Sequence, residues 1–195
     1  MKSLGAISIA AIVLMVGELA HSQTKPAQKV NPDAALAAEF DKRVIDYMKL
    51  RQKAQSGLSA PKGTESSGRI AEYQRDLAER IRAARPDAKQ GDIFTADVTN
   101  LFRRLIENSI NGPDGSKIRT SYERAEPIRG VRLTVDQAYP DGLPLQSMPP
   151  SLLLNLPKLP KKLEFRFVDH ELLLRDIAAN LIVDLIPDLT TPAQK

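Results

Sequence analysis

Acidic residues near the C-terminus are the chain's best candidates for catalysis. Asp176 and Asp184 flank an expected turn between two strands, and Glu164 and Glu171 flank the turn before it. Glycoside hydrolysis needs only two carboxyl groups at a set separation, so a pair of this kind could carry it. Each residue alternates with apolar neighbours, which favours the open side of a sheet. Asp176 and Asn180 could instead brace their turn through hydrogen bonds to the backbone. The sequence therefore singles out no catalytic pair.

Only one of the two histidines, His170, lies beyond the first 22 residues, and it stands beside Asp169 in an expected two-residue turn. A Ser-His-Asp triad needs a histidine held against a serine by a third group. A histidine in a tight turn is more typical of an exposed surface residue. The sequence contains no Gly-x-Ser-x-Gly elbow and neither of the glycine-rich phosphate loops. Neither a triad nor nucleotide chemistry is predicted.

Metal ligands are scarce as well. With no cysteine and one histidine after the leader, no transition-metal site is predicted. Residues 111–117 (NGPDGSK) invite comparison with a calcium loop, but an EF-hand needs oxygen ligands at alternate positions before its glycine. Proline and glycine at these positions favour a turn. We expect no metal and no cofactor.

Composition sets the broad class. The 195 residues are 42% hydrophobic and 27% charged, which is enough apolar material for one packed domain. The absence of cysteine excludes disulfides, thiolate metal sites and thiol nucleophiles.

The first 22 residues have the layout of a secretory signal peptide. Lys2 precedes an apolar stretch over 4–16, Gly17 interrupts it, and Ala20-His21-Ser22 places small residues at a cleavage site. The stretch is too short to span a bilayer as a stable helix, and no second one follows. We expect export, cleavage near Ser22, a flexible leader over 23–30, and a periplasmic or extracellular mature chain without a transmembrane segment. The alternatives are an uncleaved anchor and a misread start of the sequence.

The formal net charge of +4 is concentrated over 23–65, which holds 8 basic and 5 acidic residues. Five arginines over 69–85 are interleaved with acidic residues, as on a solvated helix with ion pairs three or four positions apart. Nucleic-acid binders show a coherent basic face instead, so we expect no nucleic-acid partner. The modest positive charge favours a weak attraction to anionic envelope surfaces.

Helical periodicity covers 31–125. Asn31 is suited to cap the first helix and Pro32 to begin it. The apolar stripe of this helix ends in Arg51, whose stem could cover the end of the core, and Gly57 ends the helix. A second helix over 70–84, a third beginning after Thr95 and a shorter one after Pro113 follow. Their buried positions would be Ile70, Tyr73, Leu77, Ile81, Val98, Leu101, Phe102, Leu105, Ile106, Ile118 and Tyr122.

From residue 126 the period changes to two, which indicates strands. The runs are 131–135, 163–167, 171–177 and 181–186. Their spacing predicts an antiparallel meander of three or four strands over 126–190. Such a sheet needs a cover on one face, which the helices supply. The predicted fold is α+β: three to four N-terminal helices on a small C-terminal antiparallel sheet, in one domain.

Two prolines at 149–150 and two within 157–160 frame an expected helical turn and an extended link. The link could be a stiff crossover packed on the sheet or an exposed segment that another protein recognises. Phe102, Phe165 and Phe167 are expected in the core rather than on a docking surface.

Several segments resemble known proteins. The chain resembles a group of exported bacterial proteins of unknown function in four segments: a proline- and leucine-rich segment, the strand LEFRFV, the closing LLLRDIAANLIVDLI and the mid-chain AKQGDIFTADVTNLFRRLI. The last strands are similar to those of small periplasmic proteins linked to nickel and cobalt homeostasis, from which this chain departs in its single histidine after the leader. The resemblance implies an exported location and a shared fold only.

Because the chemistries with recognisable residue requirements lack their residues, the expected function is non-catalytic binding or scaffolding in the bacterial envelope. The partner would be an envelope protein or an anionic envelope surface. The alternatives are a small envelope hydrolase with paired carboxylates and a metal- or stress-responsive factor.

Overall fold

The protein is described from a computed structural model, which covers residues 31–62, 66–123, 131–140, 148–168 and 170–189. The predicted signal peptide over 1–22, the leader over 23–30 and Asp169 lie outside these ranges. The element order is α1 (Pro32–Gln55), α2 (Ser67–Ala84), α3 (Ala96–Asn111), α4 (Gly115–Glu123), α5 (Pro150–Leu153), β1 (Leu163–Val168), β2 (Glu171–Asp176) and β3 (Leu181–Ile186).

Local signals set the helix boundaries where the sequence predicts them. The Asn31 side chain accepts a hydrogen bond from the Asp33 N–H at 3.1 Å, and α1 begins at Pro32. Thr95 caps α3 in the same way, by accepting from the Val98 N–H at 3.4 Å. Helix α1 ends just before Gly57, whose φ of 78° lies in the left-handed region that glycine adopts without strain.

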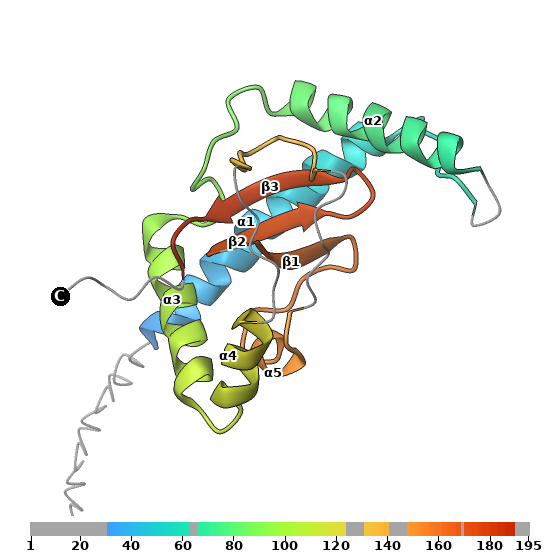
Figure 1. Ribbon diagram of the computed structural model, residues 1–195. Coiled ribbons are helices and arrows are strands. Elements are labelled where there is room, and N and C mark those ends of the chain that lie inside the picture. The colour runs from blue at the N-terminus through green and yellow to red at the C-terminus, as the bar shows by residue number, and fades with distance from the viewer. Residues whose placement is uncertain (1–30, 63–65, 124–130, 141–147, 169, 190–195) are drawn as a thin grey trace, which may run out of the picture.

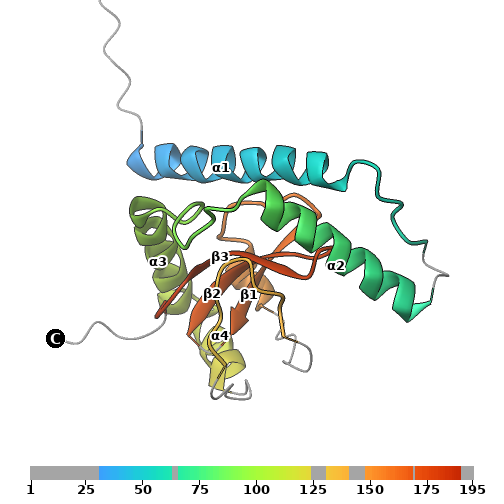
Figure 2. The same cartoon turned by 90° about the horizontal axis from the view of Figure 1, so that it is seen from above.

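The three strands form an antiparallel sheet in the order β1-β2-β3, which confirms the α+β class and the meander. Figures 1 and 2 show α1 running along one face of this sheet, with α3 crossing one end. Pairing is regular between β1 and β2, where Leu163 faces Asp176. Between β2 and β3 the register shifts after Leu174, and Val183 has no partner across the strands. This β-bulge decides which way Asp184 faces.

The fourth run of alternating residues, 131–135, forms no strand. Gln137 donates its backbone N–H to Thr134 O at 3.2 Å, and Asp136 turns the chain with a φ of 62°. The following residues join the edge of β3 instead. The Asp136 N–H donates to Ile182 O and the Tyr139 N–H to Asn180 O, both at 2.8 Å. The contact with β3 is thus a short bridge centred on Ala138 and Leu181 rather than a full strand.

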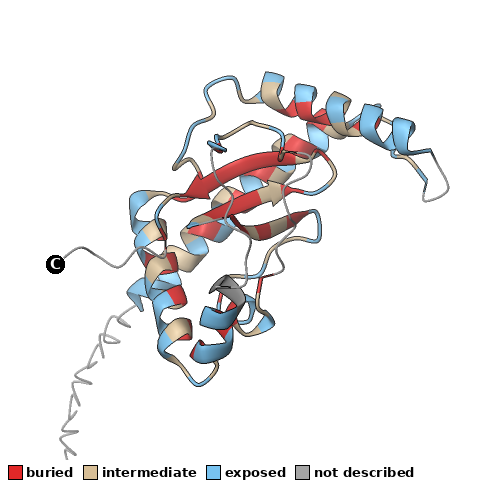
Figure 3. Cartoon of the chain, in the orientation of Figure 1, coloured by how far each residue is buried: buried red, intermediate tan, exposed pale blue. Residues whose placement is uncertain are grey.

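The core lies between α1 and the sheet. Figure 3 shows the buried residues concentrated along the strands and at intervals along the helices. Four phenylalanines form its centre: Phe40 lies 5.0 Å from Phe102 and 5.7 Å from Phe94 between ring centroids, and Phe165 lies 5.6 Å from Phe102. Phe102, Phe165 and Phe167 are all buried, as predicted. A smaller apolar cluster covers the opposite face of the sheet: Leu133, Tyr139, Val168, Leu173, Ile182 and Leu185.

Candidate functional site

Two of the four candidate carboxylates face the core. Asp176 and Asp184 each have an exposed fraction of 0%, so the expectation that they lie on the open face of the sheet is wrong. In β2 the alternation of side chains puts Leu172, Leu174 and Asp176 on the same inward face. Asp176 is therefore a polar residue at a core position, and it needs partners there.

Asp176 has four such partners. Its Oδ2 accepts from Arg51 Nε at 2.5 Å and from the Tyr47 hydroxyl at 3.0 Å. Its Oδ1 accepts from the backbone N–H groups of Ala178 and Ala179, both at 3.1 Å. The predicted bracing of the turn by Asp176 is confirmed. The sequence predicts that only the stem of Arg51 covers the core, whereas its guanidinium is buried as well and supplies the counter-charge to Asp176.

Asn180 lies at the other end of the same turn. It has a φ of 48°, and its side-chain NH₂ donates to Tyr139 O at 3.0 Å. Its Oδ1 accepts from Arg175 at 2.6 Å. The prediction that the Asn180 side chain bonds to the backbone of this turn is therefore not confirmed: its side chain joins Arg175 of β2 to the edge segment beside β3.

The β-bulge turns Asp184 inward. Without Val183 as an extra residue, strict alternation would put Asp184 on the outer face and Leu185 in the core. Its carboxylate accepts four backbone N–H bonds, from Gly91 at 3.0 Å, Ile93 at 2.7 Å, Phe94 at 2.8 Å and Leu185 at 2.8 Å. Burial raises the pKa of Asp184 even though these bonds oppose the shift. Asp184 thus fixes the loop between α2 and α3 onto β3.

The other two candidates lie on the outer face and are not neighbours. Glu164 pairs with Arg166 at 2.7 Å and with Arg175 at 2.6 Å. Glu171 pairs with Val168 at the far end of the hairpin, about 13 Å from Glu164 along the strands. Burial opposes the ionisation of Glu164, but the two arginines outweigh it and lower its pKa.

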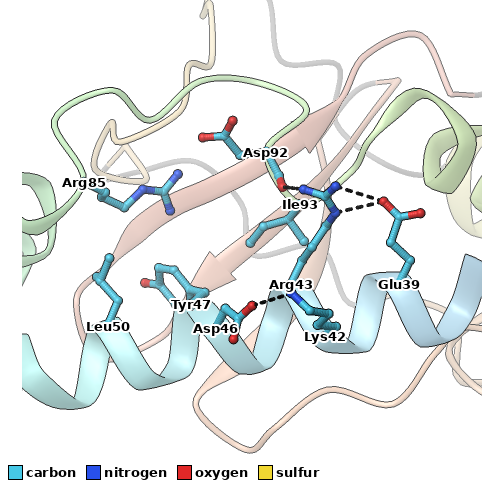
Figure 4. Close-up of a pocket in the computed structure, with 9 residues that line it drawn as sticks. All are labelled: Glu39, Lys42, Arg43, Asp46, Tyr47, Leu50, Arg85, Asp92 and Ile93. Atoms are coloured by element: carbon cyan, nitrogen blue, oxygen red, sulfur yellow. Dashed lines mark hydrogen bonds and ion pairs between the residues drawn. The ribbon is translucent and has the colours of Figure 1, made fainter.

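A cleft opens beside the buried Asp176 network, between α1 and residues 85–93. Its volume is about 400 Å³, within the range of small-ligand sites. Figure 4 shows its two halves. Tyr47, Leu50 and Ile93 supply apolar surface, while Arg43 and Lys42 line the rim with their acidic partners.

Two ion pairs form this rim, one half-exposed and one largely exposed. Arg43 pairs with Glu39 at 3.0 Å and donates to Asp92 O at 2.8 Å. Lys42 pairs with Asp46 at 3.1 Å, and hydrogen bonds from Lys42 and then Lys49 lower the pKa of Asp46. The rim thus presents both signs of charge above an apolar wall.

Arg85 closes one side of the cleft and connects it to the sheet. Its guanidinium carbon lies 5.6 Å from the centre of the Tyr47 ring, and it donates to Val183 O at 3.1 Å. The sequence predicts a solvated helix face for this arginine, but the structure places it half-buried against the sheet. Burial, and next the negative charge of Asp176, raise the pKa of Tyr47 far above its ordinary value. Tyr47 therefore stays a neutral phenol that donates to Asp176.

The remaining candidates carry no assembled chemistry in the described ranges. His170 is exposed next to the β1–β2 connection, and its backbone oxygen accepts from the Leu189 N–H at 2.7 Å. Residues 112–115 form a turn in which the Gly115 N–H donates to Gly112 O at 2.9 Å. Among the residues that the structure describes, no three His, Asp or Glu side chains gather closely enough to hold a metal ion.

Comparison with known proteins finds no matching family model, no matching curated protein and no matching solved structure. The resemblance to exported bacterial proteins stays a prediction. Over the described ranges, no helix combines the length and apolar character that crossing a membrane requires.

Sequence reasoning did not find the cleft. Its lining residues come from α1 and from the loop after α2, and Asp184 of β3 holds that loop in place. The one local signal of the buried network beside the cleft is Arg51, a charged residue in line with the apolar stripe of its helix.

Proposed function

We propose that this protein is an exported, non-catalytic binding protein of the bacterial envelope, and that it holds a small ligand in the cleft between α1 and residues 85–93. The observation that carries the proposal is that a buried hydrogen-bond network fixes one residue of the cleft wall, Tyr47. Tyr47 lines the cleft, and its hydroxyl donates a hydrogen bond to the buried Asp176. The Asp176 carboxylate also accepts from Arg51 and from two backbone N–H groups. Binding sites gain affinity when their walls are ordered before the ligand arrives.

The rim chemistry favours a small zwitterion, such as an amino acid or a short peptide. Glu39 and Arg43 present opposite charges at one end of an apolar wall. Both side chains are more than a third exposed. Half-exposed pairs of this kind contribute about 0–1 kcal/mol, so a ligand's ammonium and carboxylate groups can replace them at little cost.

The hydrolase alternative has weaker support. General acid–base catalysis requires a carboxyl group within hydrogen-bond reach of the substrate. Asp176 and Asp184 are completely buried, and their oxygens accept hydrogen bonds that fix turns and loops. Glu164 stands four residues from Glu171 along the strands, and its carboxylate is already bound by Arg166 and Arg175. A binding role therefore agrees better with the way these carboxylates are used.

Calorimetric titration of the purified protein with a panel of amino acids and dipeptides tests the binding proposal. We expect at least one member to bind, with about tenfold weaker affinity in Glu39→Gln and in Arg43→Gln. Lys53→Gln, an exposed change on the same helix, is the matched control and should leave affinity unchanged. No binding across the panel, or equal affinity in all variants, contradicts the proposal. Turnover of a panel member favours the hydrolase.

The exported location has a separate test. Mass spectrometry of the protein recovered from a periplasmic extract should find Gln23 as the first residue, because the expected cleavage follows Ser22. An intact Met1 end on protein recovered from the cytosol overturns the location, but leaves the ligand measurements valid.

A further inference from the structure

Two adjacent leucines at the end of α5 point into solvent. Leu154 is 85% exposed and Leu153 is 43% exposed. Their neighbours Leu152 and Leu156 are buried, and Asn155 donates to Ser109 Oγ of α3 at 2.9 Å. The segment is thus anchored on both sides of the exposed pair, so the exposure of these leucines is a built feature and not the end of a loose loop.

Positive charge accompanies this apolar tip. Residues 148–163 contain three lysines and no acidic residue. Lys158 and Lys161 are exposed, and Lys162 donates to Gln55 Oε1 at 3.2 Å. Leu153 and Lys158 line the same surface hollow of about 380 Å³, so these two side chains are neighbours in space as well as in sequence. Glu164 also lines this hollow, where it is paired with Arg166 and Arg175.

We propose that residues 153–161 form a docking surface for an anionic phospholipid bilayer. Leu153 and Leu154 would enter the boundary between headgroups and acyl chains, while Lys158 and Lys161 would lie among the lipid phosphates. This pairing of an apolar tip with flanking lysines is how peripheral proteins combine apolar burial with attraction to negative lipids. The proposal does not depend on the cleft or on its ligand.

The size and charge of the surface favour a membrane over a protein partner. A stable protein interface buries about 800 Å² on each side. Two leucine side chains with two lysines provide much less area. Their charge is positive, and the nearby Glu164 is already paired with two arginines. A bilayer can bind such a small surface because it presents phosphate groups and acyl chains at every position, so no match of shape over a large area is needed. The contact should be reversible, since two leucine side chains bury less apolar surface than a single acyl chain, which itself binds membranes only reversibly.

A tryptophan reporter can locate the contact, because the chain has no tryptophan of its own. The experiment uses the full chain in Leu154→Trp and Ile45→Trp forms, with sonicated vesicles of phosphatidylglycerol and phosphatidylcholine. Ile45 is the matched control, being 52% exposed on α1. Emission of Leu154→Trp should shift to shorter wavelength with these vesicles and not with phosphatidylcholine alone. Ile45→Trp should not shift. Equal shifts or no shift in Leu154→Trp overturn the proposal.

Vesicle sedimentation of otherwise unaltered chains supplies the second measurement. Leu153→Ser/Leu154→Ser should bind at least tenfold more weakly, and each of Lys158→Gln and Lys161→Gln about fivefold more weakly. Lys53→Gln is the control. Added salt should weaken binding of the parent chain. If the N-terminal apolar stretch is retained and drives binding, all variants sediment equally, and that result contradicts docking through residues 153–161.

Discussion

Arg51 and Asp176 stand 125 positions apart in the chain and form a buried ion pair, in which Nε of the arginine lies 2.5 Å from Oδ2 of the aspartate. The pair joins the end of α1 to the end of β2. The same Asp176 carboxylate accepts a hydrogen bond from the hydroxyl of Tyr47, which lines the cleft. The stability of the fold and the shape of the candidate site therefore depend on the same carboxylate.

Removing one member of this pair should destabilise the protein strongly. Arg51→Met leaves the Asp176 carboxylate buried without its counter-charge, which costs about 3–5 kcal/mol in typical cases. Urea unfolding followed by circular dichroism measures the loss. Lys42→Gln breaks an exposed pair with Asp46 and should change the free energy of unfolding by no more than about 1 kcal/mol. Similar losses in the two variants would contradict a structural role for the buried pair.

Tyr47 should make the protein sensitive to alkaline pH. Its pKa in the fold is raised above the ordinary value of 10.0, by burial and by the charge of Asp176. Between the two values the folded state holds a proton that the unfolded state has lost. The free energy of unfolding should therefore fall as pH rises above about 10. Urea titrations from about pH 8 to 11 measure this slope, which should be smaller in Tyr47→Phe than in the parent chain. An equal slope in the two chains would contradict the prediction.

Asp184→Asn tests the loop anchor. An amide has one acceptor oxygen where the carboxylate has two, so the NH₂ group replaces the oxygen that accepts from two of the four N–H groups, and those two lose their partner. We expect a loss of about 2–4 kcal/mol in unfolding free energy, and faster hydrogen exchange at Ile93 and Phe94. Asp188→Asn is the control, since Asp188 is exposed with a φ of 49° that asparagine also adopts. Unchanged exchange at both amides in Asp184→Asn would show that the anchor is dispensable.

The lowered pKa of Glu164 predicts that the free energy of unfolding falls in acid. Its two arginine partners lower its pKa from 4.5, so the folded state keeps it ionised where the unfolded state takes up a proton. Its contribution is present above about pH 4.5 and disappears as pH falls through the lowered value. Thermal unfolding from about pH 6 to 3 should show a shallower decline in Glu164→Gln than in the parent chain. An equal decline in the two chains would contradict the prediction.

Residues that act on their own neighbours were predictable. Asn31 and Thr95 cap helices by bonding to N–H groups two or three positions ahead, so sequence alone located both helix starts. Strict alternation also located β1, in which Phe165 and Phe167 enter the core.

The facing of Asp184 was not predictable by the same rule. Alternation assigns it to solvent, and only the register shift opposite Leu174 turns it inward. That shift is a property of two paired strands and has no signature in one of them. The pairing of Arg51 with Asp176 is likewise non-local, and the cleft depends on both contacts.

The long separation between Arg51 and Asp176 also bears on how the chain matures. Ribosomes add roughly 5–20 residues each second, so β2 emerges on the order of ten seconds after the end of α1. Throughout that interval the apolar stripe of α1 has no sheet to cover it. A nascent chain with this layout should bind chaperones early, and it should be most prone to aggregation when synthesis pauses before β2 appears.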